Sequence, residues 1–204
     1  MQNSENMRTE QLDLLRKIGE VGSKRAAEAL SGMISVEVEV NASDIDVVFK
    51  NKFYDAVPSL KTACFVLVIE LEGNLGGKIL FLMSANEAKL LGAALLGMEE
   101  ADIDLQDSMF HSSLKEALNV IAGAYMAVLS EVTGLEIMFS VPHLEFNSSE
   151  TQLTESGKVD GSETMLIKTA LKIQTRNFDG LFLFFPDEPT VNTICAAIGK
   201  THIG

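Results

Sequence analysis

Hydrophobic and polar positions in residues 112–134, SSLKEALNVIAGAYMAVLSEVTG, repeat with the period of an α-helix. One side of this helix is apolar and carries Leu114, Leu118, Ile121, Tyr125, Val128 and Val132. At about 100° of rotation per residue, a narrow polar stripe forms on the opposite side, made of Ser112, Glu116, Asn119 and Gly123. The pattern therefore predicts a long helix, over residues 108–133, that buries one side and displays a hydroxyl, a carboxylate and a carboxamide on the other.

A polar stripe on a helix is usually just its solvated face, and that interpretation stands beside any functional one. Gly123 is the unusual member, because a glycine inside a helix costs roughly 1 kcal/mol relative to alanine. Close approach by the surface of a partner would explain why bulk is missing at this position.

The rest of the chain predicts short strands and further helices. In the first half we expect a helix over residues 8–31 with Thr9 as N-cap and Gly32 at its end, strands over 34–40 and 45–49, a hairpin of 62–73 with 76–84, and a helix from the capping box of Ser84 and Glu87 to Gly97. In the second half we expect strands over 135–141, 143–147, 163–174 and 180–185, and a terminal helix capped by Asp187.

The second half repeats the order of elements of the first. The sequence GGKILFLMSANEAKLLGAAL overlays DGLFLFFPDEPTVNTICAAI at a constant offset, so that Gly77 falls on Gly180 and the predicted N-cap Ser84 falls on Asp187. Chance similarity between two amphipathic units is the alternative. The repeat predicts one domain over residues 1–204, with half-repeats over about 8–97 and 106–200. Its fold class is α/β of the α+β type, a pseudo-two-fold duplication of a helix–strand–hairpin–helix unit with an antiparallel sheet and two long helices.

Composition narrows the possible partners. The formal net charge of −13 argues against nucleic acids and anionic membranes, which are bound through basic patches. The opening MQNSENMRTEQ lacks the apolar region of a signal peptide, and the longest apolar run, residues 63–69, is too short to span a bilayer. Cys64 and Cys195 lie in apolar surroundings typical of buried thiols. These features together predict a cytoplasmic protein.

Candidate metal ligands are scattered. No cysteine and histidine cluster has the spacing of a metal site, and His111, His143 and His202 lie far apart in the sequence. His111 adjoins the polar stripe, where a catalytic role is possible, but an ordinary exposed histidine is the preferred interpretation.

The stripe and the strand that follows it share one pattern of spacing. Three residues separate Ser112 from Glu116, two separate Glu116 from Asn119, and twenty-two separate Asn119 from Pro142. This arrangement resembles the signature of the CheC/CheX/FliY family of chemotaxis phosphatases, which act on phosphorylated CheY. The resemblance spans essentially the whole chain and is closest to CheC, since CheX is shorter and FliY would need additional switch-binding segments.

The resemblance implies a phosphoaspartyl protein phosphatase whose substrate is a CheY-type response regulator. In that family's pattern, Asn119 positions the attacking water and Glu116 binds the active-site lysine of the regulator. Ser112 and Gly123 contact the partner, and Pro142 shapes the end of the strand. The protein needs no cofactor of its own, because the Mg²⁺ belongs to the regulator. It is either a monomer or a homodimer.

A second copy of the stripe is expected on the first helix, but its chemistry has changed. Asp13, Lys17 and Glu20 occupy the positions of Ser112, Glu116 and Asn119, and Lys24 replaces Gly123. The register follows from LLRKIGEVG, which resembles the family's LLKEIGNIG. A lysine would repel the regulator's lysine and a carboxylate would repel the phosphoryl group. Helix 1 is therefore interpreted as a structural relic with i,i+4 ion pairs, Asp13–Lys17 and Glu20–Lys24, and a retuned docking surface is the alternative.

Some CheC proteins bind the deamidase CheD through a short apolar helix in the second half. The equivalent residues here, 143–160, are mostly polar, which argues against CheD as a partner. A non-catalytic interaction module, like the middle domain of FliM, is the main alternative function, although such a scaffold has no need for Glu116 and Asn119. An enzyme acting on a small molecule is a further alternative, disfavoured because a convex helix face lines no cleft.

Overall fold

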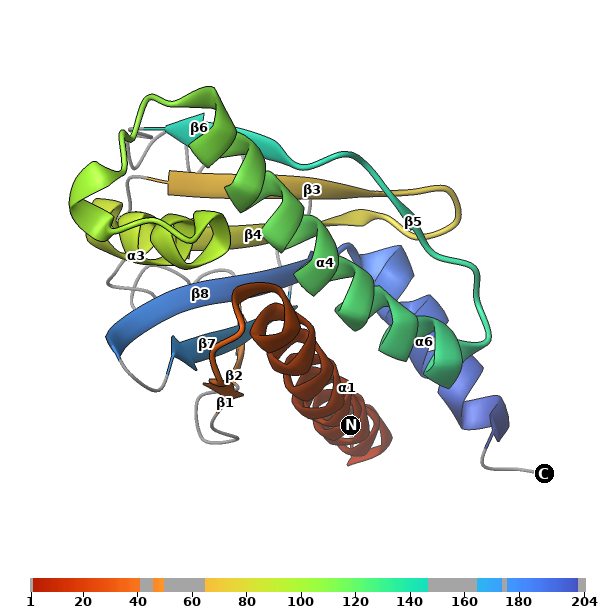
Figure 1. The fold of residues 1–204 in the computed structure, drawn as a ribbon. Helices are drawn as coiled ribbons and strands as arrows, with labels where there is room; N and C mark the ends of the chain where they lie inside the picture. Colours follow the sequence, from red (N-terminus) through yellow and green to blue (C-terminus); the bar gives the residue numbers. More distant parts are fainter. Residues whose placement is uncertain (1, 41–45, 50–64, 147–164, 174–175, 202–204) are drawn as a thin grey trace.

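The computed structural model describes residues 2–40, 46–49, 65–146, 165–173 and 176–201 (Figure 1). Its helices are α1 (Gln2–Ile34), α3 (Ala85–Leu96), the short 3₁₀ helix η4 (Glu100–Asp102), α4 (Ser108–Thr133) and α6 (Glu188–Thr201). Its strands are β1 (Val38–Val40), β2 (Asp46–Phe49), β3 (Phe65–Glu72), β4 (Gly77–Met83), β5 (Met138–Phe139), β6 (His143–Phe146), β7 (Met165–Ile173) and β8 (Arg176–Pro186). Within these ranges, no helix is both long and apolar enough to cross a membrane.

The strands form one antiparallel sheet, and its strand order is symmetric when each strand is exchanged for the equivalent strand of the other half of the chain. The order is β1-β7-β8-β4-β3-β5, and in addition β2 pairs with β7 and β6 pairs with β3. The short strands of each half therefore pair with the hairpin of the other half: β1 and β2 pair with β7, and β5 and β6 pair with β3. The predicted pseudo-two-fold α+β fold with an antiparallel sheet is confirmed.

The pairing of the two central strands shows the axis of this pseudo-symmetry. In the β4–β8 ladder Leu80 lies opposite Leu183, and Gly77 lies opposite Pro186. Leu80 and Leu183 are also equivalent positions in the repeat, which relates each residue of β4 to the residue 103 further along the chain. A residue that pairs with its own repeat copy lies on a two-fold axis, so the axis passes between these two leucines.

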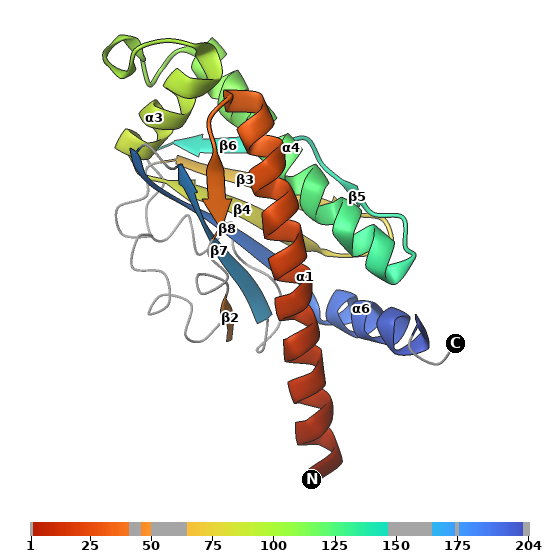
Figure 2. The same cartoon turned by 60° about the horizontal axis from the view of Figure 1, so that its bottom comes forward.

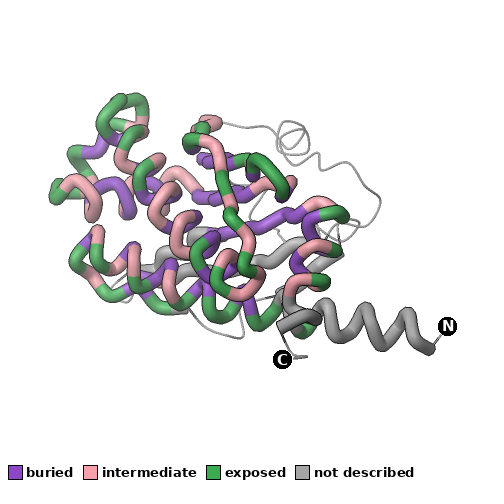
Figure 3. Tube along the Cα trace, turned by 90° about the vertical axis from the view of Figure 1, so that its right-hand side faces the viewer, coloured by how far each residue is buried: buried purple, intermediate pink, exposed green. Residues whose placement is uncertain are grey.

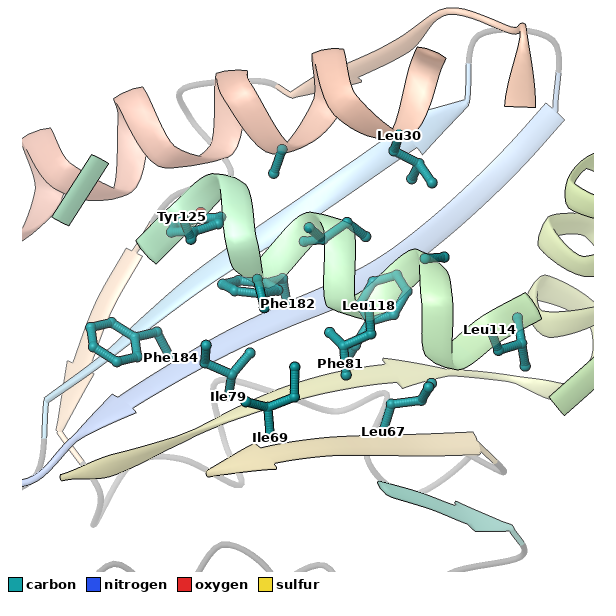
Figure 4. Packing of buried hydrophobic residues seen from close by; sticks show 14 of the residues in the cluster. Leu30, Leu67, Ile69, Ile79, Phe81, Leu114, Leu118, Tyr125, Phe182 and Phe184 are labelled. Atoms are coloured by element: carbon teal, nitrogen blue, oxygen red, sulfur yellow. The ribbon is translucent and has the colours of Figure 1, made fainter. Parts of the chain in front are cut away.

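All of the long helices contribute to one core on one face of the sheet. Helices α1 and α4 lie side by side across that face, and α3 and α6 contact α4 from either end (Figures 1 and 2). Figure 4 shows the apolar side of α4, with Leu114, Leu118 and Tyr125 pointing at the sheet residues Phe81 and Phe182. All five of these side chains are buried, and the Tyr125 ring stacks on that of Phe182 at a centroid distance of 4.3 Å.

Most predicted helix ends are confirmed. Ser84 and Glu87 form the capping box of α3, and Gly97 ends that helix in the left-handed conformation with φ of 64°. Asp187 caps α6, because its Oδ1 accepts a hydrogen bond from the backbone N–H of Thr190 at 2.8 Å. Gly134 ends α4 with φ of 69°.

The predicted ends of the first helix are wrong. Helix α1 begins at Gln2 rather than at Thr9, because the polar sequence before Thr9 holds no helix breaker, and it continues past Gly32 to Ile34. Leu30 and Ile34 are both buried one turn apart, and this burial outweighs the unfavourable propensity of Gly32. The helix ends where Ser35 adopts a positive φ of 54°.

Two predicted strands are much shorter than expected. Of residues 34–40, only Val38–Val40 form a strand, because the helix takes the first residue and a turn takes the next. Of residues 135–141, only Met138–Phe139 do. At this second place Leu135 is held by the end of α4, since its carbonyl accepts a hydrogen bond from the Ser130 hydroxyl at 2.7 Å. Pro142, which has no N–H, then separates β5 from β6.

Candidate functional site

Helix α4 divides into a buried and an open side, as its sequence predicts. Its N-cap is Asp107, whose Oδ1 accepts hydrogen bonds from the N–H groups of Met109 and Phe110 at 2.6 and 3.0 Å. Figure 3 shows buried and exposed positions alternating along the helices that cover the sheet. On α4, Leu118 and Ile121 are fully buried, whereas Ser112 and Glu116 are exposed. The two cap interactions and the apolar side therefore hold the polar stripe in one orientation.

The polar stripe is one wall of a groove with a volume of about 270 Å³. The residues of α4 that line this groove are Ser112, Lys115, Glu116 and Asn119. The other wall is the segment that joins β5 to β6, with Phe139, Ser140, Val141 and Pro142. Four residues singled out by the resemblance to a family signature, Ser112, Glu116, Asn119 and Pro142, thus lie around one groove, although Pro142 is 23 positions after Asn119.

The second wall is attached to the sheet through Ser140. Its backbone N–H donates to the carbonyl of Glu70 at 2.9 Å, and its Oγ accepts a hydrogen bond from the Glu70 N–H at 3.0 Å. Phe139, the residue before it, pairs with Leu71 of β3. Pro142 is buried and cannot donate a backbone hydrogen bond, so the chain turns away from the ladder at this point. Strand β3, which pairs with both β5 and β6, therefore holds this wall of the groove.

The carboxylate and the carboxamide of the stripe make few contacts of their own. Glu116 is exposed and Asn119 is half-buried. Neither side chain forms a hydrogen bond or an ion pair with the part of the chain that the structure describes. Their polar groups are consequently available to a molecule that enters the groove.

The two smaller members of the stripe differ from that pair. The Ser112 hydroxyl donates to the carbonyl of Ser108 at 2.8 Å, so its proton is used within the helix. A Cβ built on Gly123 would meet nothing within 4 Å. No internal packing requires a glycine at position 123, and the open space above it faces outward.

The expectation that this helix face lines no cleft is wrong. The sequence predicts the stripe from periodicity within one helix, but the opposite wall comes from a segment that packs there only through β3. Sequence reasoning therefore missed four lining residues: Lys115, Phe139, Ser140 and Val141. For Lys115 a signal existed, because it lies three residues after Ser112 and four before Asn119 on the same side of the helix.

His111 is not the ordinary exposed histidine that was expected. It is half-buried beside the rings of Phe65, Phe110 and Phe146, and its Nε2 donates to the carbonyl of Leu105 at 2.7 Å. It does not line the groove. Within the described ranges, no three His, Cys, Asp or Glu side chains are grouped to hold a metal ion. Cys195 is half-buried, and burial raises the pKa of its thiol; Cys64 and His202 lie outside the described residues.

The altered stripe on α1 is exposed along its length, at Asp13, Lys17, Glu20 and Lys24. The predicted pairing of Asp13 with Lys17 is wrong: Asp13 instead lies 3.7 Å from Arg16, one turn away. The predicted pair of Glu20 with Lys24 does not form either, since no ion pair joins them in the described structure. The charges of this stripe therefore do little to stabilise the helix and remain directed at solvent.

An ion pair and a buried hydroxyl pair join α1 to α4. The Arg25 guanidinium donates two hydrogen bonds to the Glu131 carboxylate, at 2.6 and 2.7 Å. The hydrogen bond from Arg25 lowers the pKa of the Glu131 carboxyl below its ordinary value. Deeper in the interface, the hydroxyl of Tyr125 contacts that of Ser23 and lies 3.3 Å from the carbonyl of Gly19. These contacts join the two helices that carry the stripes.

Comparison with known proteins identifies the class of protein that shares this sequence and fold. Residues 65–161, which include α4 and both walls of the groove, match the family "Chemotaxis phosphatase CheX". The chain is 23% identical over 203 residues to "CheY-P phosphatase CheC" of Bacillus subtilis, covering 96% of this chain and 97% of that protein. It is 24% identical over 165 residues to "Flagellar motor switch phosphatase FliY" of the same organism, covering 79% of this chain but 42% of FliY.

Solved structures of the same group share the fold. FliY of Thermotoga maritima superposes with a TM-score of 0.69 at 17% identity, covering 94% of this chain and 96% of that one. The CheX chain of the CheX–CheY–BeF₃–Mg²⁺ complex from Borrelia burgdorferi gives 0.58 at 20% identity, covering 83% and 97%. The middle domain of FliM from H. pylori gives 0.65 at 14% identity, covering 92% and 98%. Together, the comparisons support the CheC/CheX/FliY family for this chain.

Proposed function

We propose that this protein accelerates hydrolysis of the aspartyl phosphate on a CheY-type response regulator. The observation that carries the proposal is the placement of Glu116 and Asn119 in one groove, where neither has a hydrogen-bond or ion-pair partner among the described residues. A helix face of this kind can enter the phosphorylation pocket of another protein. The family relationship supplies the substrate, since the relatives include a CheY-P phosphatase.

Asn119 is proposed to hold the attacking water. A carboxamide offers one acceptor and two donors, so it can orient a water molecule without exchanging a proton with it. The water oxygen attacks phosphorus in line with the aspartyl oxygen, the bond from phosphorus to that oxygen breaks, and phosphate and a free aspartate result. The proton released by the water passes to a phosphoryl oxygen or to solvent, so the protein forms no covalent bond to its substrate. Positioning of this type parallels the glutamine that orients water in GTPases.

Glu116 is proposed to set the docking register. Its exposed carboxylate can form a charge-assisted hydrogen bond with a lysine of the regulator's active site. Gly123 leaves space for the regulator's surface, and the Ser112 hydroxyl contacts the regulator's edge through its lone pairs, since it donates its hydrogen to the carbonyl of Ser108. Pro142 holds the second wall of the groove, and the Mg²⁺ needed for phosphoryl chemistry belongs to the regulator. Such regulators act in the cytoplasm, where we expect this protein.

The deciding experiment is phosphate release from a CheY-type regulator phosphorylated with a small acyl phosphate, with and without this protein. We expect clear acceleration by the wild type. Asn119→Ala should keep the regulator bound but lose acceleration on the order of 10²-fold, because it removes positioning alone. Full activity of Asn119→Ala would exclude the role proposed for this amide, and no acceleration by the wild type would exclude the phosphatase function itself.

A non-catalytic interaction module is the second candidate, and the similarity to the FliM middle domain favours it at the level of fold. The two candidates differ in one measurable respect. A module that only binds the regulator would leave the lifetime of the phosphoaspartate unchanged at saturating concentration, whereas the proposed phosphatase shortens it.

A further inference from the structure

Lys115 is a member of the groove that no motif accounts for. It contributes the only positive charge among the eight residues that line the groove in the described structure. The lysine is half-buried, as is usual for a side chain whose apolar stem packs on the protein while its charge stays hydrated. It forms no ion pair within the described residues.

The position of Lys115 on the helix places it at one edge of the polar stripe. With Ser112 at zero, Lys115 lies near −60°, Asn119 near −20° and Glu116 near +40° at about 100° per residue. The carboxamide thus stands between a cation on one side and an anion on the other. Lys115 and Asn119 are four residues apart, a spacing that brings their Cβ atoms within about 6 Å on a helix surface. The centre of the stripe would face the phosphoryl group, and its edges would face the rim of the partner's pocket.

The net negative charge of the chain makes a cation at the docking site useful for binding an acidic partner. With a formal net charge of −13, the protein repels any acidic partner at long range, and a phosphorylated carboxylate site is such a partner. A single cation beside the docking residues offsets that repulsion locally and favours one orientation over its reverse. Glu116 at +40° and Lys115 at −60° place opposite charges on the two sides of the stripe. A partner with one cation and one anion at its own site can therefore pair with both in only one orientation.

We propose that Lys115 is a docking and specificity residue that binds a carboxylate at the rim of the regulator's phosphorylation site. This inference rests on the proposed function, and it adds a contact that the motif does not contain. Lys115 acts on the encounter and its orientation, and it takes no part in the attack on phosphorus. Partners that lack an acidic group at this rim would then be poorer substrates.

The test compares Lys115→Met with the matched control Lys89→Met, a lysine of α3 that is also half-buried but does not line the groove. In phosphate-release assays at low salt, Lys115→Met should raise KM about fivefold, the upper end for an exposed ion pair, with kcat changed less than twofold. The difference should shrink as ionic strength rises to about 1 M, where screening reaches within a few ångströms. Lys115→Arg should restore KM, and Lys89→Met should match the wild type.

Lys115 could bind either a carboxylate at the rim of the regulator's site or the phosphoryl group itself. Measuring the affinity for the regulator with and without beryllofluoride and Mg²⁺ distinguishes the two. A rim carboxylate predicts the same loss of affinity for Lys115→Met in both states of the regulator. A loss confined to the beryllofluoride form would assign Lys115 to the phosphoryl group and overturn the proposal. Unchanged KM and salt dependence in an active protein would overturn it while leaving the phosphatase function intact. A wild type that releases no phosphate would overturn both.

Discussion

Glu116 and Asn119 differ in how far the groove covers them, and the difference matches the division of labour proposed for them. The exposed carboxylate of Glu116 can meet a partner before the surfaces close, whereas Asn119, which lines the same groove, is half-buried. A residue that positions water benefits from restriction, because every lost rotamer reduces the entropy that the reaction must overcome. Of the two residues, the one that is proposed to position water is therefore the more buried.

Replacement of Glu116 should affect docking before chemistry. Glu116→Ala removes one half of a charge-assisted hydrogen bond, so affinity for a beryllofluoride-loaded regulator should fall by about tenfold, and Glu116→Lys should weaken binding further through repulsion. Titration of the regulator by calorimetry, with phosphate release measured alongside, checks both. Unchanged affinity together with an unchanged rate would remove Glu116 from the site.

Gly123 and Gly22 offer a matched test of why each glycine is present. At Gly123 an added Cβ meets nothing within 4 Å, so Gly123→Ala should stabilise the helix by about 1 kcal/mol and yet weaken regulator binding. At Gly22 an added Cβ would lie 2.5 Å from a ring atom of Tyr125, so Gly22→Ala should destabilise the fold by about 1–3 kcal/mol. Urea unfolding and a binding assay on both variants measure these effects. Unimpaired binding by Gly123→Ala would mean that no partner approaches this position.

The stripe could be predicted from sequence because it depends on one helix, whose period relates residues three, four and seven apart. The wall opposite could not, since it depends on the hydrogen bonds between Ser140 and Glu70, which are 70 residues apart. Pro142 was found through its match to the family signature, but that match did not show that it would line a groove with Asn119. Lys115 was overlooked although helical spacing places it beside Ser112 and Asn119, because without the second wall it resembles any solvated lysine.

At the scale of elements, the pairing of α1 with α4 determines where both stripes lie. The sequence suggests i,i+4 ion pairs within α1, but among the described side chains Asp13 pairs with Arg16 instead, and the bidentate pair of Arg25 with Glu131 crosses to the other helix. Helical periodicity predicts contacts along one helix, whereas contacts across helices depend on the crossing geometry. The end of α1 was mispredicted similarly, because burial of Ile34 decided it against the propensity of Gly32.

The Arg25–Glu131 pair predicts a pH-dependent difference in stability. The pKa of Glu131 is lower in the folded protein than in the unfolded chain, so the pair stabilises the fold above the unfolded value. That contribution is lost as pH falls through the lower, folded value. Thermal unfolding of the wild type and Glu131→Gln should therefore differ at neutral pH, and the difference should begin to shrink only below the ordinary glutamate pKa of about 4.3 and vanish below the folded value. A difference that stays constant across this range would assign the effect of the substitution to packing.

At the scale of the whole molecule, the two halves are joined by exchanged strands. Strand β2 of the first half pairs with β7, and β6 of the second half pairs with β3. The duplication was visible in sequence as a repeat at constant offset, because both copies retain the pattern of hairpin and capped helix. The exchange was not visible, because short edge strands carry little periodicity and their partners are chosen by the completed sheet. A half that lacked the other would expose the inner edge of its hairpin.

The exchange of strands predicts a single cooperative unfolding transition. It also predicts that equivalent substitutions on the two sides of the pseudo-two-fold axis cost similar amounts of unfolding free energy. Leu80 and Leu183 lie opposite one another at that axis, and both are buried. Leu80→Ala and Leu183→Ala should each cost about 2–5 kcal/mol of unfolding free energy, and the two costs should agree within about 1 kcal/mol. Circular dichroism, which reports helix and sheet together, and tyrosine fluorescence, to which the buried Tyr125 contributes, should give coincident urea transitions for both variants. If one substitution split the transition into two steps, one half would be able to fold without the strands of the other, and the chain would have to be described as two domains that share a sheet.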